Sequence, residues 1–241
     1  MLRFIKFAKD ALLAFPLTLI FLPFSRFFSF LYYYNKLVIW IWKNKGDVTY
    51  HDFYSPFRDY KKRYALYENI LQEQKLKEES ICYLEFGVAS GASFKWWLEH
   101  NTNIDSHFYG FDTFEGLPEK WGSFDKGAMS YKIPEIDDSR AKFFKGLFQE
   151  TLNPFIQSHE VNITSSARRI FHMDADLYSA TIFSLSQLFP YLKKGDLIMF
   201  DEFSVAMHEF KAFDEFVSNF YIKLRPIAAV NNFYQICFIV E

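Results

Sequence analysis

Residues 81–91 have the sequence ICYLEFGVASG, and this stretch decides the fold. Its first four residues form a short apolar run typical of a strand, and Gly87 and Gly91 then bracket a turn. Residues 90–100 continue with helical spacing and no proline. Glycine is needed where backbone approaches a ligand closely, and the start of a helix offers free N–H groups to polar ligand atoms. The stretch therefore predicts a strand, a turn and a helix around a nucleotide-like cofactor, although such a turn also serves as a plain packing device.

Acidic residues end three further apolar runs downstream of this turn. Asp112 ends the next strand-like run, where it is placed either to bind ribose hydroxyls or to cap the following segment. The other acids are Asp174, Asp176, Asp201 and Glu202. Ligands in parallel sheets bind outside the carboxyl ends of the strands, so these side chains are expected at one edge. Clustered carboxylates suit Mg²⁺ or another hard divalent cation, and no His/Cys set has zinc spacing.

Strand-like and helical stretches alternate along the rest of the chain. Apolar runs of strand type occupy residues 81–88, 108–112, 141–145, 169–174, 196–201, 226–230 and 233–240, and helical spacing is clearest over 90–100, 181–192 and 208–220. This alternation predicts an open, mostly parallel α/β sheet with helices on both faces. The last two runs are joined only by Asn231 and Asn232, which indicates a hairpin.

Four longer motifs resemble one family of enzymes. They are DTFEGLPE at 112–119, KGLFQETL at 145–152, DADLY at 174–178 and GDLIMFDE at 195–202. In this order they resemble the macrocin/mycinamicin-type O-methyltransferases, the TylF family, over about residues 65–220. The resemblance implies a Rossmann-like class I methyltransferase fold with a seven-stranded, mostly parallel sheet and a C-terminal antiparallel hairpin. It also implies transfer of a methyl group from S-adenosylmethionine (SAM) to a sugar hydroxyl.

The same resemblance implies roles for individual residues. SAM would be held by Glu85, Gly87, Ser90, Gly91, Ser93, Asp112, Thr113, Phe114 and Asp174. The metal ligands would be Asp174, Asp201 and Glu202, where Glu202 departs from the commoner Asp-Asp pair but still offers a carboxylate.

Asp176 is the general base that the resemblance implies. A sugar hydroxyl is a poor nucleophile, and a divalent cation lowers its pKa as it does for water, so that a nearby carboxylate can take the proton. The alternative is that Asp176 caps the helix that follows it. His208 is a second candidate base or substrate ligand, although lone histidines are more often structural. His172 lies within a strand-like run and is expected in the core.

Composition is consistent with one catalytic domain. The chain has 241 residues, half of them apolar, and a net charge of −2. Cys82 and Cys237 both lie in strand-like runs, which favours buried free thiols and a reducing compartment. Nucleic acid is excluded as a partner because the catalytic part is acidic and has no basic stripe.

Residues 1–46 differ sharply from the remainder. They hold seven Lys or Arg against one Asp, among many apolar and aromatic side chains. Basic, aromatic and apolar character together predict an element that lies on a membrane surface, at the inner face of the cytoplasmic membrane. The longest charge-free run, 11–25, is too short for a full span and contains Pro16. The alternative is that these helices pack on the domain or on a second copy of the chain.

The sequence therefore predicts three segments: 1–46 as a membrane-associating element, 47–80 as a helical lid with its helix at 58–76, and 81–241 as the SAM-dependent methyltransferase domain. Residues 121–138 are expected to form a mobile loop over the acceptor site. Aromatic side chains that could stack on a sugar are Trp96, Trp97, Trp121, Phe124 and Tyr178.

Three functions fit these features. The first is a metal-dependent O-methyltransferase acting on a glycan or glycolipid precursor at the membrane. The second is a methyltransferase of the same fold acting on a small natural product or phenol, with residues 1–46 as an oligomerisation element. The third is a non-catalytic membrane-bound scaffold. The intact set of Asp174, Asp176 and Asp201 argues against the third.

Overall fold

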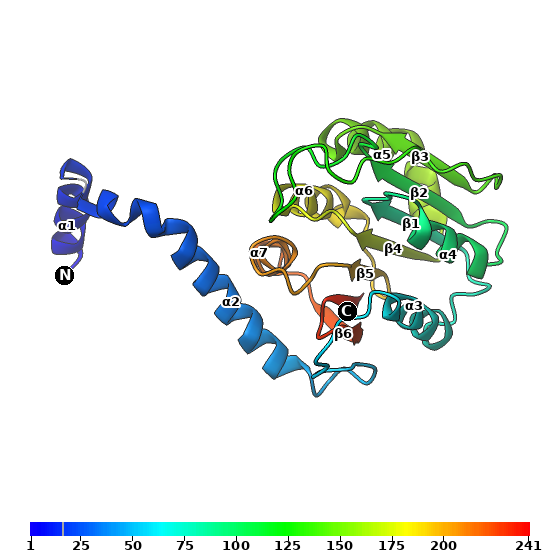
Figure 1. Cartoon of the computed structure of the whole chain (residues 1–241), viewed down its shortest axis with the longest axis horizontal. Coiled ribbons are helices and arrows are strands. Elements are labelled where there is room, and N and C mark those ends of the chain that lie inside the picture. The colour runs from blue at the N-terminus through cyan, green and yellow to red at the C-terminus, as the bar shows by residue number, and fades with distance from the viewer. Residues whose placement is uncertain (16) are drawn as a thin grey trace.

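The computed structural model describes residues 1–15 and 17–241, so Pro16, which was expected to interrupt the apolar run, lies outside the described residues. A seven-stranded sheet forms the centre of the molecule (Figure 1). Its strands are β1 (Ile81–Phe86), β2 (His107–Asp112), β3 (Ala141–Lys145), β4 (Arg168–Met173), β5 (Leu197–Phe200), β6 (Leu224–Val230) and β7 (Gln235–Val240). Their order is β3-β2-β1-β4-β5-β7-β6. Only β7 runs antiparallel to its two neighbours, which confirms the predicted mostly parallel sheet with a C-terminal hairpin.

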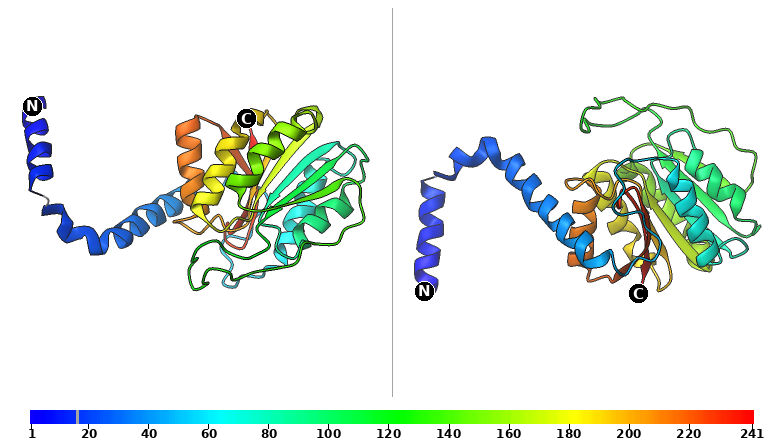
Figure 2. Two further views of the ribbon diagram at one scale, coloured as in Figure 1. Left: turned by 90° about the horizontal axis from the view of Figure 1, so that it is seen from above. Right: turned by 60° about the horizontal axis from the view of Figure 1, so that its bottom comes forward.

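Alternation along the strands divides the core into two layers. In β1, Cys82, Leu84 and Phe86 belong to one buried cluster, whereas Ile81 and Tyr83 belong to the other. Helices α5 (Phe148–Ser165), α6 (Tyr178–Leu188) and α7 (Glu209–Phe220) supply the first cluster. Helices α3 (Lys62–Glu73) and α4 (Ala92–His100) supply the second. The sheet is therefore covered on both faces, as the alternation of strands and helices predicted (Figure 2).

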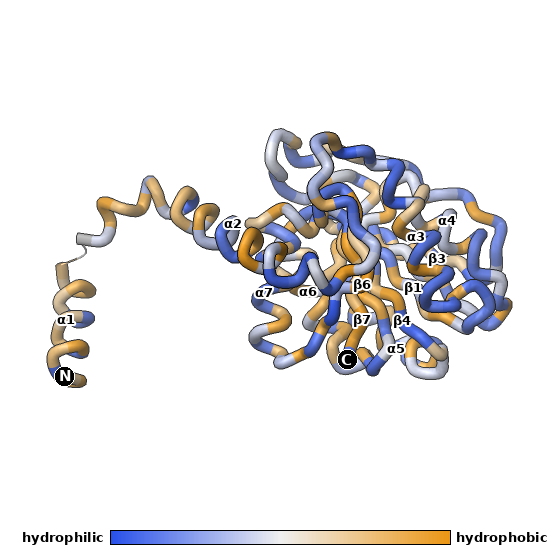
Figure 3. Tube along the Cα trace, turned by 90° about the horizontal axis from the view of Figure 1, so that it is seen from below, coloured by the Kyte–Doolittle hydropathy of each residue, from blue (hydrophilic) through white to orange (hydrophobic). Residues whose placement is uncertain are grey.

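The N-terminal helices project away from this domain. They are α1 (Leu2–Ala14), the 3-10 helix η1 (Leu17–Phe24) and α2 (Ser25–Asn44). Figure 3 shows that apolar residues recur along all three, and no described residue of α1 is buried. In the described part of the chain no single helix is long and apolar enough to cross a membrane, whereas Leu2–Ala14 and Thr18–Asn44 together, as a bent pair, meet the length and composition of a span.

The C-terminal half of α2 is docked on the domain. Leu37 and Ile41 are buried, and the Trp40 ring lies edge-on to the rings of Phe203 and Phe213 at centroid distances of 5.0 and 5.7 Å. Polar contacts reach further up the helix: the Tyr33 hydroxyl donates to Glu215 of α7 at 2.7 Å, and Lys36 pairs with Asp214. The C-terminal part of α2 packs on the domain, as one alternative for residues 1–46 expected. The earlier part of the helix is exposed, so it is still free to bind a membrane surface or a second copy of the chain.

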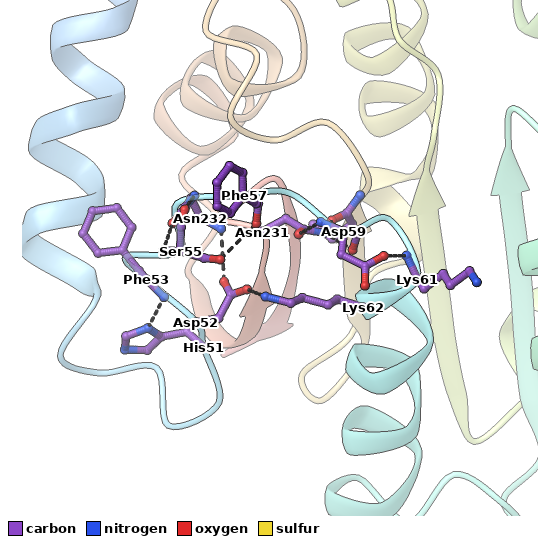
Figure 4. A network of polar contacts seen from close by, with 11 residues as sticks. His51, Asp52, Phe53, Ser55, Phe57, Asp59, Lys61, Lys62, Asn231 and Asn232 are labelled. Atoms are coloured by element: carbon purple, nitrogen blue, oxygen red, sulfur yellow. Dashed lines mark hydrogen bonds and ion pairs between the residues drawn. The ribbon is translucent and has the colours of Figure 1, made fainter.

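The segment between α2 and α3 is fastened to the β6–β7 hairpin (Figure 4). Asp52 pairs with Lys62 at 2.6 Å and accepts the backbone N–H of Asn232 at 3.1 Å. The Asn231 side chain accepts from the backbone N–H of Asp59 and donates to its carbonyl, both at 2.9 Å. These bonds fix the start of α3 against the hairpin.

Two details differ from the sequence predictions. The hairpin connection is four residues, Asn231 to Tyr234, rather than the two asparagines alone, because the chain turns back through positive φ angles at 231–233 and buries Phe233 in the core. Helix α5 was not singled out, although it contributes five buried apolar residues; it contains Pro154, and its apolar positions are sparse. His172, expected in the core, is 1 % exposed.

Candidate active site

A cavity of about 380 Å³ opens at the carboxyl ends of the strands. Its walls come from the turn after β1, the segments after β2 and β3, the loop after β4 with the start of α6, and Glu202 after β5. Tyr60 and Arg63, around the start of α3, and Tyr234, in the β6–β7 connection, also contribute. This is the edge at which a doubly wound sheet binds its ligands, and the volume is within the range of small-molecule sites. The predicted motifs therefore meet around one cavity although they are spread over more than a hundred residues.

Three carboxylates form a compact cluster beside this cavity. One oxygen from each of Asp174, Asp201 and Glu202 lies within 4.8 Å of the others. The clustering follows from the register, because β4 and β5 are parallel neighbours that end side by side. Asp201 and Glu202 are buried, and Asp201 Oδ1 and Glu202 Oε2 have no hydrogen-bond partner among the described residues. Buried polar atoms are normally paired, so these two oxygens point to a ligand that completes them.

The electrostatics of the cluster support this interpretation. Burial raises the pKa of Glu202 well above its usual value, and the charges of Asp174 and Asp201 add to the shift. Burial and Asp201 likewise raise the pKa of Asp174. Like charges crowded in a low-dielectric site resist ionisation, and a bound cation would relieve that repulsion. The oxygen-only donor set and its spacing fit a hard divalent ion such as Mg²⁺.

Asp176 lies in the loop between β4 and α6 with a positive φ of 56°. It lines the cavity, and burial together with the charges of Asp201 and Asp112 raises its pKa to about 7. The alternative that it caps the following helix is wrong: the N-cap of α6 is Leu177, and the side chain that accepts the first backbone N–H of α6, at Tyr178, is His208 rather than Asp176. The loop therefore places the Asp176 carboxylate at the cavity rather than at the N-cap of α6.

The glycine turn is constrained by the protein's own backbone. Gly87 has φ of 99°, and a Cβ there would lie 1.8 Å from the backbone oxygen of Asp174. Glycine is thus required by the close approach of the β1 and β4 ends, besides any ligand. Asp112 lies at the tip of β2, where its carboxylate accepts the backbone N–H groups of Ala89 at 2.8 Å and Phe114 at 2.7 Å. Asp112 therefore bridges the glycine turn to the segment that follows β2.

The residues expected to hold SAM fall into two groups. Those on the cavity wall are Gly87, Asp112, Thr113 and Asp174, and those outside the lining are Glu85, Ser90, Gly91, Ser93 and Phe114. Glu85 is buried and accepts a hydrogen bond from Tyr83. Ser93 accepts one from the Tyr67 hydroxyl at 3.2 Å. Phe114 is buried and packs near Phe143.

His208 occupies the N-cap position of α7, and its Nδ1 lies 3.4 Å from the backbone nitrogen of Tyr178. Burial lowers its pKa, and the charge of Lys211 adds to this. Its ring lies 6.5 Å from that of Trp121, which stacks on Phe124, and both aromatic rings line the cavity. His208 itself is outside the lining. Trp96 and Trp97 belong to α4 and pack with Tyr67 in the second core cluster.

Sequence reasoning missed two charged residues at this site. Glu209 is fully buried, and its carboxylate accepts the backbone N–H of Glu202 at 2.9 Å, which ties the start of α7 to the end of β5. Arg63 lies in the cluster itself: Nη2 is 2.9 Å from Asp201 Oδ2, and Nη1 is 4.0 Å from Asp174 Oδ2. Neither stands out in the sequence, where each is one charge among several on an amphipathic helix.

The strand order, the cavity at the strand ends and the glycine turn define a class I methyltransferase fold. Among solved structures, the chain is similar to the calicheamicin methyltransferase CalS11, with 19 % identity, 76 % of this chain and 80 % of that chain covered, and a TM-score of 0.58. The apo structure of CalS11, described as a TDP-rhamnose 3'-O-methyltransferase, gives 20 % identity, the same coverage and a TM-score of 0.53. The O-methyltransferase NovP gives 17 % identity, coverage of 75 % and 78 %, and a TM-score of 0.52.

Residues 68–235 match the sequence model of the family described as macrocin O-methyltransferase (TylF). The chain belongs to this family, and it is a SAM-dependent O-methyltransferase. A search of curated proteins found no significant match. Membership of the family confirms the resemblance inferred from the four sequence motifs.

Proposed function

We propose that this enzyme transfers the methyl group of SAM to a sugar hydroxyl in a reaction that depends on a divalent cation. The observation that carries the metal dependence is the cluster of Asp174, Asp201 and Glu202, which holds two buried oxygens without partners. We assign these three residues to the cation. We assign SAM binding to the glycine turn and the strand ends beside it, with Asp112 placed for the ribose.

A cation held by these carboxylates would lower the pKa of the acceptor hydroxyl. Asp176 then acts as the general base. Burial and the charges of Asp201 and Asp112 raise its pKa in the metal-free cluster. A bound cation would lower that pKa, so the cation would supply much of the activation of the hydroxyl. The place of Asp176 in the cavity wall lets it reach an acceptor there. His208, next to Trp121, is the second candidate for contact with the acceptor.

A sugar acceptor is supported by family membership and by the aromatic wall of the cavity. Trp121 and Phe124 stack with a ring-centroid distance of 5.7 Å, and both face the cavity from the segment after β2. Flat aromatic surfaces of this kind pack against the apolar faces of sugar rings. The fold neighbour CalS11 is named as a TDP-rhamnose 3'-O-methyltransferase, which is the same class of reaction.

We infer that residues 1–46 bring the enzyme to the inner face of the cytoplasmic membrane, where the acceptor is a glycan or glycolipid precursor. The support is the row of exposed apolar side chains in α1, η1 and the first half of α2, together with the excess of basic residues. On this proposal residues 47–80 form a lid segment and 81–241 the catalytic domain. A second candidate, a small natural-product acceptor with these helices as an oligomerisation element, is supported by the same exposed surface.

Isothermal titration with SAM, with and without Mg²⁺, tests the first part of this proposal. We expect SAM to bind and EDTA to abolish methyl transfer. Binding of neither SAM nor Mg²⁺ would refute the enzyme proposal, and full activity in EDTA would remove the metal from it. The acceptor is then sought by mass spectrometry, as the glycan or lipid that lacks a methyl group when the protein is absent.

A further inference from the structure

The strongest unexplained contact at the site is the position of Arg63. Its guanidinium lies between two of the carboxylates assigned to the cation, 2.9 Å from Asp201 and 4.0 Å from Asp174. Asp201 is 1 % exposed, so this pair is screened much less than a pair on the surface. Arg63 thus supplies the positive charge that the cluster needs when no metal ion is bound.

A cation that contacts both Asp174 and Asp201 would meet this guanidinium. Mg²⁺ binds carboxylate oxygen at about 2.1 Å, so it would lie within the 4.8 Å cluster that Arg63 already neutralises. Mg²⁺ and the Arg63 guanidinium would both contact the same two carboxylates, so they would lie close together and repel each other strongly. Metal binding therefore favours the displacement of Arg63.

The arginine has room to move while its backbone stays in place. The start of α3 is fastened by the Asp52–Lys62 pair and by the bonds between Asp59 and Asn231 (Figure 4). Its side chain is 20 % exposed and borders the cavity, and its guanidinium carbon already lies 5.7 Å from the centroid of the Tyr60 ring, a cation–π contact that does not involve the carboxylates. Asp201 keeps a second donor, because the Gln235 side-chain amide lies 3.4 Å from its Oδ2.

The cavity also shows where a displaced guanidinium would go. Among the described residues that line it, Arg63 is the only Lys or Arg, whereas Asp112, Asp174, Asp176 and Glu202 all carry carboxylates. SAM brings a carboxylate of its own into this acidic space, and arginine is the side chain best suited to pair with a carboxylate in two parallel hydrogen bonds. Arg63 is therefore the one group of the described cavity wall whose charge matches that end of the methyl donor.

We propose that Arg63 is a positioning residue that exchanges partners: it neutralises Asp174 and Asp201 in the metal-free enzyme, and a divalent cation releases it to bind the carboxylate of SAM. This proposal rests on the proposed function of the same cavity. It makes metal and SAM binding cooperative, because the metal frees the arginine that the methyl donor needs. By linkage, SAM must then tighten metal binding by the same factor.

Calorimetric titrations of the full chain with Mg²⁺ alone, SAM alone and SAM in saturating Mg²⁺ test this exchange. In the wild type we expect Mg²⁺ to raise SAM affinity by about tenfold, within the usual range of coupling between sites. In Arg63→Gln we expect tighter binding of Mg²⁺ alone, weaker binding of SAM in Mg²⁺, and no coupling between the two. Arg63→Lys, which keeps the charge but loses the planar fork, should retain competition with Mg²⁺ and lose most of the SAM affinity.

Arg225→Gln is the matched control, because it removes an equally charged side chain from an exposed pair with Glu241. It should leave all three affinities unchanged, and thermal melts of each variant would establish that it is folded. Equal Mg²⁺ affinity in the wild type and Arg63→Gln, or SAM affinity in the wild type that is indifferent to Mg²⁺, would overturn the exchange. Failure of the wild type to bind either ligand would instead overturn the proposed function.

Discussion

The carboxylate cluster and the N-terminal helices depart from ordinary burial in opposite directions. At the ends of β4 and β5, acidic groups are buried, with two oxygens that lack partners. In α1, η1 and the first half of α2, large apolar side chains such as Phe7, Phe21 and Phe28 are more than half exposed. Both arrangements are unfavourable for the isolated chain, since buried charge loses hydration and exposed apolar surface orders water. Each is explained if a ligand completes it, a cation in one case and an apolar surface in the other.

Helix α2 contains the boundary between buried and exposed apolar side chains. Its last turns follow the usual rule, with Leu37 and Ile41 inside and Trp40 among aromatic rings. Its first turns do not, although their composition is similar. The difference lies in the surface that each part meets, because from Tyr33 onward the helix lies against α7 and the core beneath it.

The largest effect is expected beside the buried carboxylate cluster. Asp176→Asn keeps the size of the side chain but removes its ability to accept a proton, so turnover should fall by about 10²- to 10⁴-fold. SAM affinity, measured by calorimetry, should be retained. Glu99→Gln is the control, because Glu99 is an exposed acid on α4 that pairs with exposed Lys95 and lies outside the cavity lining. Full activity of Asp176→Asn would remove this residue from the role of base.

The second prediction tests the boundary within α2. Trp40→Ala removes a ring packed against Phe203, Phe213 and Phe238, so the free energy of unfolding should fall by about 3 to 5 kcal/mol in urea titrations. Phe28→Ala on the same helix should change it by less than about 0.5 kcal/mol, because Phe28 is 52 % exposed. Equal losses at the two positions would mean that the first half of α2 is also covered in the folded protein.

The smallest effect is expected in the exposed N-terminal helices. Phe21→Asp places a charge in the exposed apolar surface of η1, and binding to vesicles of anionic phospholipid should fall by about tenfold in cosedimentation, since burying one such side chain is worth about 1.5 to 3 kcal/mol. Tyr221→Asp is the control: Tyr221 is 90 % exposed but lies at the end of α7 on the catalytic domain. If the wild type ignores vesicles and its oligomeric state changes with Phe21→Asp, the helices serve to assemble copies of the chain.

The alternation of elements and the motifs at the strand ends made the sheet predictable. Strand positions from β1 to β7 agree with the apolar runs to within a few residues, because each run is short, continuous and bounded by polar or glycine-rich turns. Helix α5 was not predicted, because its apolar positions are too sparse to show a helical period. The length of the hairpin connection was not predicted either, because the positive φ angles at Asn231 and Phe233 cannot be read from the residue types.

The candidate site was only partly accessible from the sequence. Asp174, Asp176, Asp201 and Glu202 were identified because each follows a strand, and parallel strands end at the same edge. Arg63 and Glu209 were not, because they enter the cluster from the starts of α3 and α7, and a charge at the start of an amphipathic helix is ordinarily solvated. Their contacts depend on how two helices lie over the sheet edge, which no local pattern encodes.

By itself, the sequence determined the class of fold, the family and the carboxylates at the strand ends, because hydrophobic periodicity and contiguous motifs are local properties of the chain. Tertiary structure alone decided that Arg63 lies between Asp174 and Asp201, that Glu209 fastens the end of β5, and that α2 is docked at Trp40 but exposed at Phe28. The contact of Glu209 spans only seven residues, whereas those of Arg63 and Trp40 join segments more than a hundred residues apart; all of them are set by how the helices pack against the sheet.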